Sequence, residues 1–274
     1  MVTMTLNEWT RYRDLLKRLS DLAAGDFRDA VFKAGGKFGA AGLDKIPKEE
    51  LIDYAYALVQ KYGTGAAEAA CEWYDAIAEL SGANVDPAEP AEMPDYGEVA
   101  KAINGTLKTG NEEIVAGAVG RQVKLAGQDT TLQNAMRDSS LVAWMTTGDT
   151  CAYCLSLSAM GWVNASEDML EGGHTKHIHP NCDCFYAVKF DPDTIYEGYN
   201  YEENYKKVYQ AALDQGVIKE GEQISNTKLL SKDILNATRR EAYDENSEEI
   251  NSQKRSAYAK QQERESARAE EVKL

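Results

Sequence analysis

The chain has 274 residues, 43% of them hydrophobic, and a formal net charge of −15. This composition can supply the core of one large or two small domains. It contains no apolar run of the roughly 18 residues that a membrane span needs, and its amphipathic N-terminus does not resemble a secretion signal, so we expect a soluble protein with no membrane partner, made in a reducing cytoplasm.

The negative charge is unevenly distributed along the chain. Residues 51–100 contain ten acids and a single base, Lys61, whereas residues 201–274 are close to neutral. An acidic surface repels phosphate backbones, so we do not expect the body of the protein to bind nucleic acid through a basic surface. Whether the C-terminal segment contacts DNA stays open.

The first eighty residues carry the pattern of amphipathic helices. Apolar residues at three- and four-residue steps predict a helix with one buried face: Trp9, Tyr12, Leu16, Leu19 and Ala23. Pro47 followed by two glutamates predicts the start of a second helix, and a third is expected at about 65–80. Cys71 lies on that third helix, far from any other cysteine or histidine, and we interpret it as a small buried apolar residue. Residues 1–82 therefore form an N-terminal helical region.

A proline-rich acidic segment follows at residues 83–95. Pro87, Pro90 and Pro94 prevent a helix there, so the segment is either a linker or an extended arm, and we expect a boundary at this point. Helices are expected to resume from about 95 to 146. The last of them is predicted to begin with a capping box at Thr130 and Gln133.

The remaining sequence divides into three parts. Residues 96–192 are expected to form a core of helices and a Cys/His hairpin, in which 185–190 is a strand. Residues 193–221 carry a tyrosine-rich helix that suits either an interface or ordinary core packing. Residues 222–274 contain too little apolar surface to pack well, and predict an extended helical or disordered tail that gains order on a partner. The expected fold is mainly α with a small β-hairpin (α+β).

Four of the five cysteines and all three histidines lie between residues 151 and 184. Cys151 and Cys154 have the C-x-x-C spacing that presents two sulfurs to one metal ion, and a second pair of donors beyond a loop can complete a tetrahedral structural Zn²⁺ site. The candidates for that second pair are His174, His177, His179, Cys182 and Cys184. We favour the ligand set Cys151, Cys154, His179 and Cys182, with Cys184 as a competing ligand.

The predicted metal site favours a structural role over catalysis. Four protein ligands leave no open position for water, which catalytic zinc requires. The zinc deaminase motif is not met, because no histidine is followed by glutamate two residues later. We therefore expect no enzymatic activity and no catalytic residues. The alternative function is a metal-dependent hydrolase or nuclease that uses the cluster, and a cytoplasmic adaptor is a third reading.

Residues 144–190 resemble the signature of tailed-phage minor capsid proteins, the head-morphogenesis family of phage Mu protein F-like type. The positions that carry the resemblance are Thr150, Cys151, Cys154, the SAMGWV turn at 158–163, His179, Cys182, Asp183 and Cys184. The extra histidines His174 and His177 depart from the family pattern. The resemblance implies a low-copy protein of the virion, located inside the capsid near the portal and assembled in the bacterial host cytoplasm. It would act in head assembly or genome delivery. Its expected partners are the portal protein, other capsid components and further copies of itself.

Overall fold

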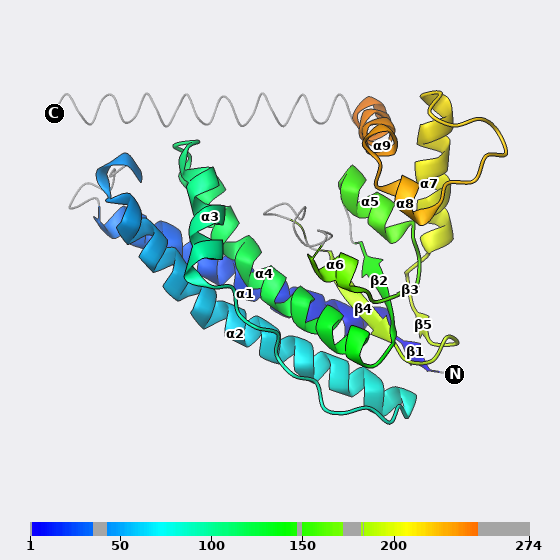
Figure 1. The fold of residues 1–274 in the computed structure, drawn as a ribbon, viewed down its shortest axis with the longest axis horizontal. Coiled ribbons are helices and arrows are strands. Elements are labelled where there is room, and N and C mark those ends of the chain that lie inside the picture. The colour runs from blue at the N-terminus through cyan, green and yellow to red at the C-terminus, as the bar shows by residue number, and fades with distance from the viewer. Residues whose placement is uncertain (1, 35–42, 147–149, 172–181, 183, 246–274) are drawn as a thin grey trace. The chain divides into compact units, whose positions relative to one another are not determined.

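The computed structural model describes residues 2–34, 43–146, 150–171, 182 and 184–245. Contacts between Cα atoms divide the chain into two units. The first unit contains residues 1–150 and 160–202, and the second contains residues 151–159 and 203–274. The described residues are mainly helical with short strands, which confirms the predicted α+β class (Figure 1). No helix among them is long and apolar enough to cross a membrane.

Long helices make up most of the first unit. They are α1 (Leu6–Ala34), α2 (Lys48–Ser81) and α4 (Glu112–Arg137), joined by the shorter α3 (Tyr96–Leu107) and the 3₁₀ helix η1 (Leu43–Lys45). Four of the five residues on the predicted buried face of α1 are buried: Trp9, Tyr12, Leu16 and Ala23 are all at most 5% exposed. The fifth, Leu19, is only partly buried. The second and third predicted helices are one continuous helix, α2. Gly63 lies within it, where the side chains of Met93 and Ala126 pack against its backbone.

Helix α4 is buried on nearly every side. It packs against both α1 and α2, and Figure 1 shows these three helices running alongside one another. Two glycines allow the close approach. A Cβ at Gly120 would lie 2.8 Å from the carbonyl oxygen of Ser20 in α1, and a Cβ at Gly127 would lie 3.1 Å from the carbonyl oxygen of Ala66 in α2. Because nearly every side of α4 is enclosed, polar residues such as Gln128, Thr130 and Asn134 are buried beside apolar ones, and the sequence of the helix lacks a clear apolar stripe.

The segment 83–95 is an extended arm held by hydrogen bonds to the helices beside it. Asn134 of α4 accepts from the backbone NH of Glu89 at 2.9 Å and donates to its carbonyl oxygen at 2.8 Å. Thr130 accepts from the NH of Ala91 at 3.0 Å. The arm thus belongs to the same unit as the helices before and after it, and the chain does not divide at the expected boundary.

The end of α4 corrects the sequence analysis. The helix ends at Arg137, Ser139 adopts a positive φ of 53°, and the residues expected to continue the helix form strand β2 (Leu141–Met145). The apolar residues from 142 to 145 are all buried, so their pattern suits a buried strand as well as a helix. The predicted capping box is also wrong, because Thr130 lies inside α4 and donates to the carbonyl oxygen of Ala126.

Strand β2 is the centre of a small antiparallel sheet. It pairs with β3 (Val163–Asn164) on one side and with β4 (Phe185–Lys189) on the other. The predicted strand at 185–190 is therefore confirmed. A second pair is parallel and joins β1 (Thr3–Met4) to β5 (Ile195–Tyr196), which brings the start of the chain beside residue 195. Helix α6 (Glu167–Glu171) lies between β3 and β4 in the chain.

The second unit consists of short helices. They are α5 (Ala152–Ser158), most of α7 (Tyr201–Asp214), α8 (Asn226–Leu229) and α9 (Lys232–Glu245). Two tyrosines of α7 act inside the unit, since the hydroxyl of Tyr205 accepts from the NH of Ile224 at 3.0 Å and that of Tyr209 accepts from Gly221 at 2.9 Å.

The expected tail differs from the structure over its first half. Helices α8 and α9 contribute buried side chains, among them Leu229, Ile234 and Ala237 at 0 to 2% exposure, and α9 packs against α5. A few apolar residues are enough to order this segment, because the short helices of the second unit share one small hydrophobic core. Residues 246–274 of the predicted tail lie outside the described residues.

Candidate metal centre

Cys182 and Cys184 lie immediately before strand β4, and helix α4 holds their backbone. Lys124 donates from its buried ammonium to the carbonyl oxygen of Cys182. Gln128 donates to the carbonyl oxygen of Cys184 at 3.3 Å and accepts from the NH of Tyr186 at 2.8 Å. Both side chains are almost fully buried, at 4% and 1% exposure. Buried polar side chains need hydrogen-bond partners. Lys124 and Gln128 find theirs in the backbone at Cys182 and Cys184, and these bonds hold the two cysteines against α4.

Cys151 and Cys154 lie at the start of helix α5. Cys151 is the N-cap residue, and its Sγ accepts from the backbone NH of Cys154 at 3.5 Å. Cys154 is fully buried, whereas Cys151 is half-buried. Burial raises the pKa of the neighbouring Tyr153 hydroxyl, and the nearby Cys154 and Cys151 raise it further. The C-x-x-C spacing thus forms a helix start in which the two cysteines differ in exposure.

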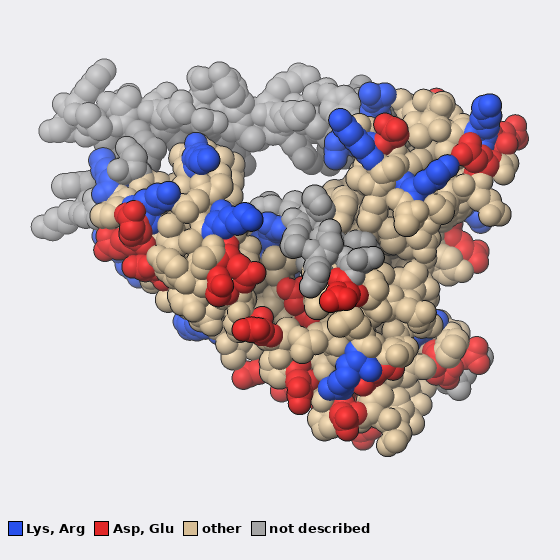
Figure 2. Space-filling view, in the orientation of Figure 1, with Lys and Arg blue, Asp and Glu red and all other residues tan. Residues whose placement is uncertain are grey.

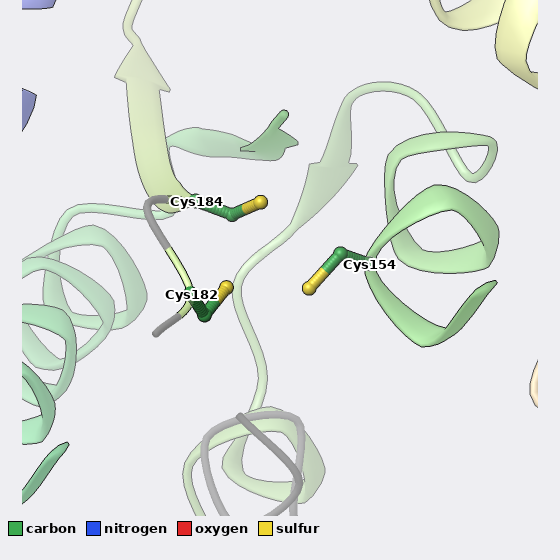
Figure 3. Close-up of side chains that lie close together, drawn as sticks. All are labelled: Cys154, Cys182 and Cys184. Atoms are coloured by element: carbon green, nitrogen blue, oxygen red, sulfur yellow. The ribbon is translucent and has the colours of Figure 1, made fainter. Parts of the chain in front are cut away.

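Three cysteine sulfurs converge at this site. The Sγ atoms of Cys154, Cys182 and Cys184 lie within 4.8 Å of one another, and all three residues are buried. Figure 3 shows the three side chains pointing toward one another. None of them forms a disulfide. Two thiolates on one tetrahedral Zn²⁺ ion stand about 3.8 Å apart, given Zn–S bonds of about 2.3 Å. Small side-chain shifts would therefore bring all three sulfurs to one ion.

The donor set suits a soft metal ion. Thiolate ligands select zinc, copper(I) or iron–sulfur chemistry over magnesium and calcium, which prefer oxygen ligands. Within the described residues, no other set of three cysteine, histidine or carboxylate groups converges in this way. Three thiolates leave one position of a four-coordinate site for a further ligand.

The predicted ligands have different outcomes. Of the four favoured ligands, the structure brings Cys154 and Cys182 together. The third member of the described group is Cys184, the competing candidate, and Cys151 does not belong to it. The favoured histidine, His179, lies outside the described residues, as do His174 and His177. Lys124 and Gln128 could not be predicted from the motif, because each lies more than fifty residues from the cysteine whose carbonyl oxygen it binds.

Comparison with known proteins yields one family. The VG15 protein family matches residues 3–212, which include the helical body, the small sheet and all five cysteines. None of the curated proteins and none of the solved structures compared gives a significant match. Because the family match spans well over half of the sequence, the chain belongs to the VG15 protein family, a family of viral proteins.

Proposed function

We propose that this protein is a structural minor capsid protein of a tailed bacteriophage, carried inside the head near the portal, where it acts in head assembly or genome delivery. The observation that carries the proposal is the convergence of Cys154, Cys182 and Cys184 in a chain of a viral family. These cysteines belong to the local signature that resembles the Mu protein F-like head-morphogenesis family. Membership of the VG15 family supports the viral part of the proposal.

The metal in this proposal is Zn²⁺, with a structural role. Zinc is redox-inert and accepts tetrahedral thiolate and imidazole ligands. Three buried sulfurs suit a site that pins the chain in place rather than one that admits a substrate. Cys154, Cys182 and Cys184 would hold the ion, and the fourth ligand would be His179 or Cys151. A bound zinc ion would crosslink the segment at Cys154 to the segment at Cys182 and Cys184. Its binding free energy would then add directly to the free energy of folding.

Charge also supports a protein partner over a nucleic-acid partner for the body. On the face seen in Figure 2, acidic and basic side chains of the first unit are interspersed. That face offers no continuous basic surface among the described residues, and phosphate backbones bind best to such surfaces. The proposed partners are therefore the portal protein and other proteins of the head.

The test of this function is the composition of purified particles. We expect mass spectrometry of nuclease-treated virions to detect the protein at low copy number. We also expect the tagged protein to co-purify with the portal protein of the same phage. Particles that lack the protein but are fully infectious would contradict the proposal. Deletion of the gene should leave shells that assemble but deliver DNA poorly, because a low-copy component does not build the shell.

Cobalt substitution separates the structural role from the hydrolase alternative. Co²⁺ bound by four protein ligands gives tetrahedral d–d absorption bands that small added anions do not change. An open coordination position, which a metal hydrolase requires, binds azide or cyanide and shifts those bands. We expect no shift for the loaded protein.

A further inference from the structure

One face of helix α1 carries apolar side chains that the rest of the described chain leaves uncovered. Leu15, Leu22 and Phe32 are 43%, 44% and 60% exposed. They belong to a row of eight positions, here named the α1 stripe: Glu8, Arg11, Leu15, Arg18, Leu22, Gly25, Asp29 and Phe32. The steps between these positions alternate between three and four residues. That spacing is typical of a helix that packs along another helix.

Gly25 leaves a gap between the side chains of the α1 stripe. A Cβ added at Gly25 would meet no atom within 4 Å, and the residue does not have a positive φ. Neither packing nor backbone conformation within the described chain therefore requires glycine here, although glycine in a helix interior costs about 0.5 to 1 kcal/mol relative to alanine. A surface hollow of about 630 Å³ lies over this position, between Leu22 and Asp29 among others. Such a hollow can accept a leucine side chain from another molecule.

Charges along the α1 stripe are ordered from positive to negative. Arg11 and Arg18 precede Leu22, and Asp29 follows it. No described residue forms an ion pair or a hydrogen bond with the side chains of these three residues. Their charges are thus available to a partner. A partner that matches them must present an acidic group opposite Arg11 and a basic group opposite Asp29.

A second copy of the same helix, running antiparallel, meets both requirements. Arg11 and Asp29 are equally far from position 20, about 13.5 Å in each direction along the helix. A two-fold axis at that position places Arg11 of each copy opposite Asp29 of the other. The same axis places Leu15 over Gly25, and Arg18 beside Leu22. A parallel pair would instead place each arginine against its own counterpart, which like-charge repulsion disfavours.

We propose that the α1 stripe is an interface between two copies of this chain, which pair antiparallel about a two-fold axis near residue 20. Each Leu15 enters the hollow over the Gly25 of the other copy, and each Arg11 faces an Asp29. An interface of this kind is isologous, so every contact occurs twice. The inference depends neither on the proposed capsid role nor on the metal, because it uses only residues of α1.

Sedimentation velocity of the full, metal-loaded chain over a range of concentrations tests the apolar part of the interface. We expect a reversible monomer–dimer equilibrium for the natural sequence. Leu22→Glu should weaken the dimer at least about tenfold, which corresponds to about 1.4 kcal/mol. The matched control is Ile114→Glu on α4, because Ile114 is similarly exposed at 40% but lies outside the α1 stripe. This control should dimerise like the natural sequence.

Charge exchange tests the orientation. Arg11→Glu and Asp29→Arg should each weaken the dimer, and the two together should restore it, because the exchanged pair is again opposite in sign. Gly25→Ala should raise the melting temperature of the monomer through its helix propensity and still weaken the dimer by narrowing the hollow.

Three results would overturn the proposal. The first is a natural sequence that stays monomeric at every concentration. The second is a dimer that responds equally to Leu22→Glu and to Ile114→Glu. The third is a monomer in which residues 15–32 are strongly protected from hydrogen exchange, which would assign the stripe to another part of the same chain.

Discussion

Cys71 differs chemically from the four cysteines near the candidate metal centre. It is 9% exposed on α2, and burial raises the pKa of its thiol to about 11, with a further contribution from the negative charge of Asp75. At pH 8 only about one thiol in a thousand is then ionised. We expect iodoacetamide to label Cys71 in the folded protein far more slowly than in urea, and the folded rate to rise about tenfold per pH unit up to pH 11.

Peptide mass spectrometry at several pH values measures this rate without interference from the other cysteines. The unfolded chain is the control, because its thiols have ordinary pKa values near 8.5. Equal labelling rates for the folded and unfolded protein at pH 8 would contradict the assignment of Cys71 to the core.

Asp138 caps the end of α4 and couples stability to pH. Its carboxylate accepts from Arg137 at 2.8 Å and from the hydroxyl of the fully buried Tyr74 at 2.8 Å. The bond from Arg137 lowers the pKa of Asp138 below its ordinary value, and the bond from Tyr74 lowers it further, against the opposing effect of burial. A lowered pKa means that the ionised carboxylate stabilises the folded state. This stabilisation is present above the unfolded pKa, near 3.9, and is lost as the pH falls through the folded value.

Asp138→Asn should therefore lower the free energy of unfolding by about 1 to 3 kcal/mol at pH 7. Below pH 4 the gap between the two proteins should shrink, because the natural aspartate is itself becoming protonated. Urea titrations at pH 7 and at pH 3 measure the gap. A gap of the same size at both pH values would show that the charge is not responsible.

Individual residues could be predicted where one local property decides their environment. Cys71 lies beside several alanines in helix α2, and its predicted burial is confirmed. Thr130 shows the opposite case. The sequence Thr-x-x-Gln satisfies the local rule for a helix start, yet the residue lies inside α4, where its hydroxyl donates to Ala126 and accepts from the arm. Its role depends on Ala91, 39 residues away in the sequence, which no local pattern contains.

Close packing of helices α1 and α4 depends on Gly120. An added Cβ there would lie 2.7 Å from the hydroxyl oxygen and 2.8 Å from the carbonyl oxygen of Ser20. A backbone atom cannot move aside as a flexible side chain can. We therefore expect Gly120→Ala to lower the free energy of unfolding by about 1 to 3 kcal/mol, because the two helices must separate slightly.

Gly105→Ala is the matched control for this packing. Gly105 also lies inside a helix, α3, but a Cβ there would meet no atom within 4 Å. Alanine should stabilise the protein at this position by up to about 1 kcal/mol through helix propensity. Urea unfolding of both variants measures the difference. A Gly120→Ala variant that is as stable as Gly105→Ala would mean that α1 and α4 do not approach so closely.

Helices could be predicted from the sequence more reliably than their ends and partners. The spacing of the apolar residues between Trp9 and Ala23 predicts both the existence of helix α1 and most of its buried face. The sequence predicts a continued helix where strand β2 lies, because four consecutive buried apolar residues fit a helix and a strand equally well. The positive φ at Ser139 and the pairing with β4 show that the segment is a strand. The arm was recognised as extended from its prolines, but its hydrogen bonds to Thr130 and Asn134 are tertiary and leave no sequence pattern.

The candidate metal centre could be located from the sequence, but its described members could not be chosen. From their spacing alone, Cys151 and Cys154 are equally good metal ligands, and Cys182 and Cys184 compete for the same ligand position. In the structure, Cys154 is buried with Cys182 and Cys184, whereas Cys151 is half-buried and caps helix α5. Burial is set by the packing of whole elements, and therefore separates cysteines that the motif treats alike.

Metal binding is expected to control the stability of the whole chain. We expect the purified protein to contain about one zinc ion per chain, because three thiolates and one further donor complete a single tetrahedral site. Cys182→Ser should abolish most of this binding, and should lower the melting temperature as far as removal of the metal by a chelator does. The reason is that structural zinc contributes its binding free energy, several kcal/mol or more, to folding.

Cys71→Ser provides the matched control for the metal experiment. It changes the same atom in another buried cysteine, one that does not belong to the group of converging sulfurs. It should lower stability modestly and leave the zinc content unchanged. Elemental analysis and thermal unfolding with and without chelator measure both quantities in the three proteins. The chelator should have little further effect on Cys182→Ser, because that variant has already lost the ion. A metal-free natural protein with an unchanged melting curve would contradict the assignment. So would a Cys182→Ser variant that keeps its zinc, since the three sulfurs would then not act as one site.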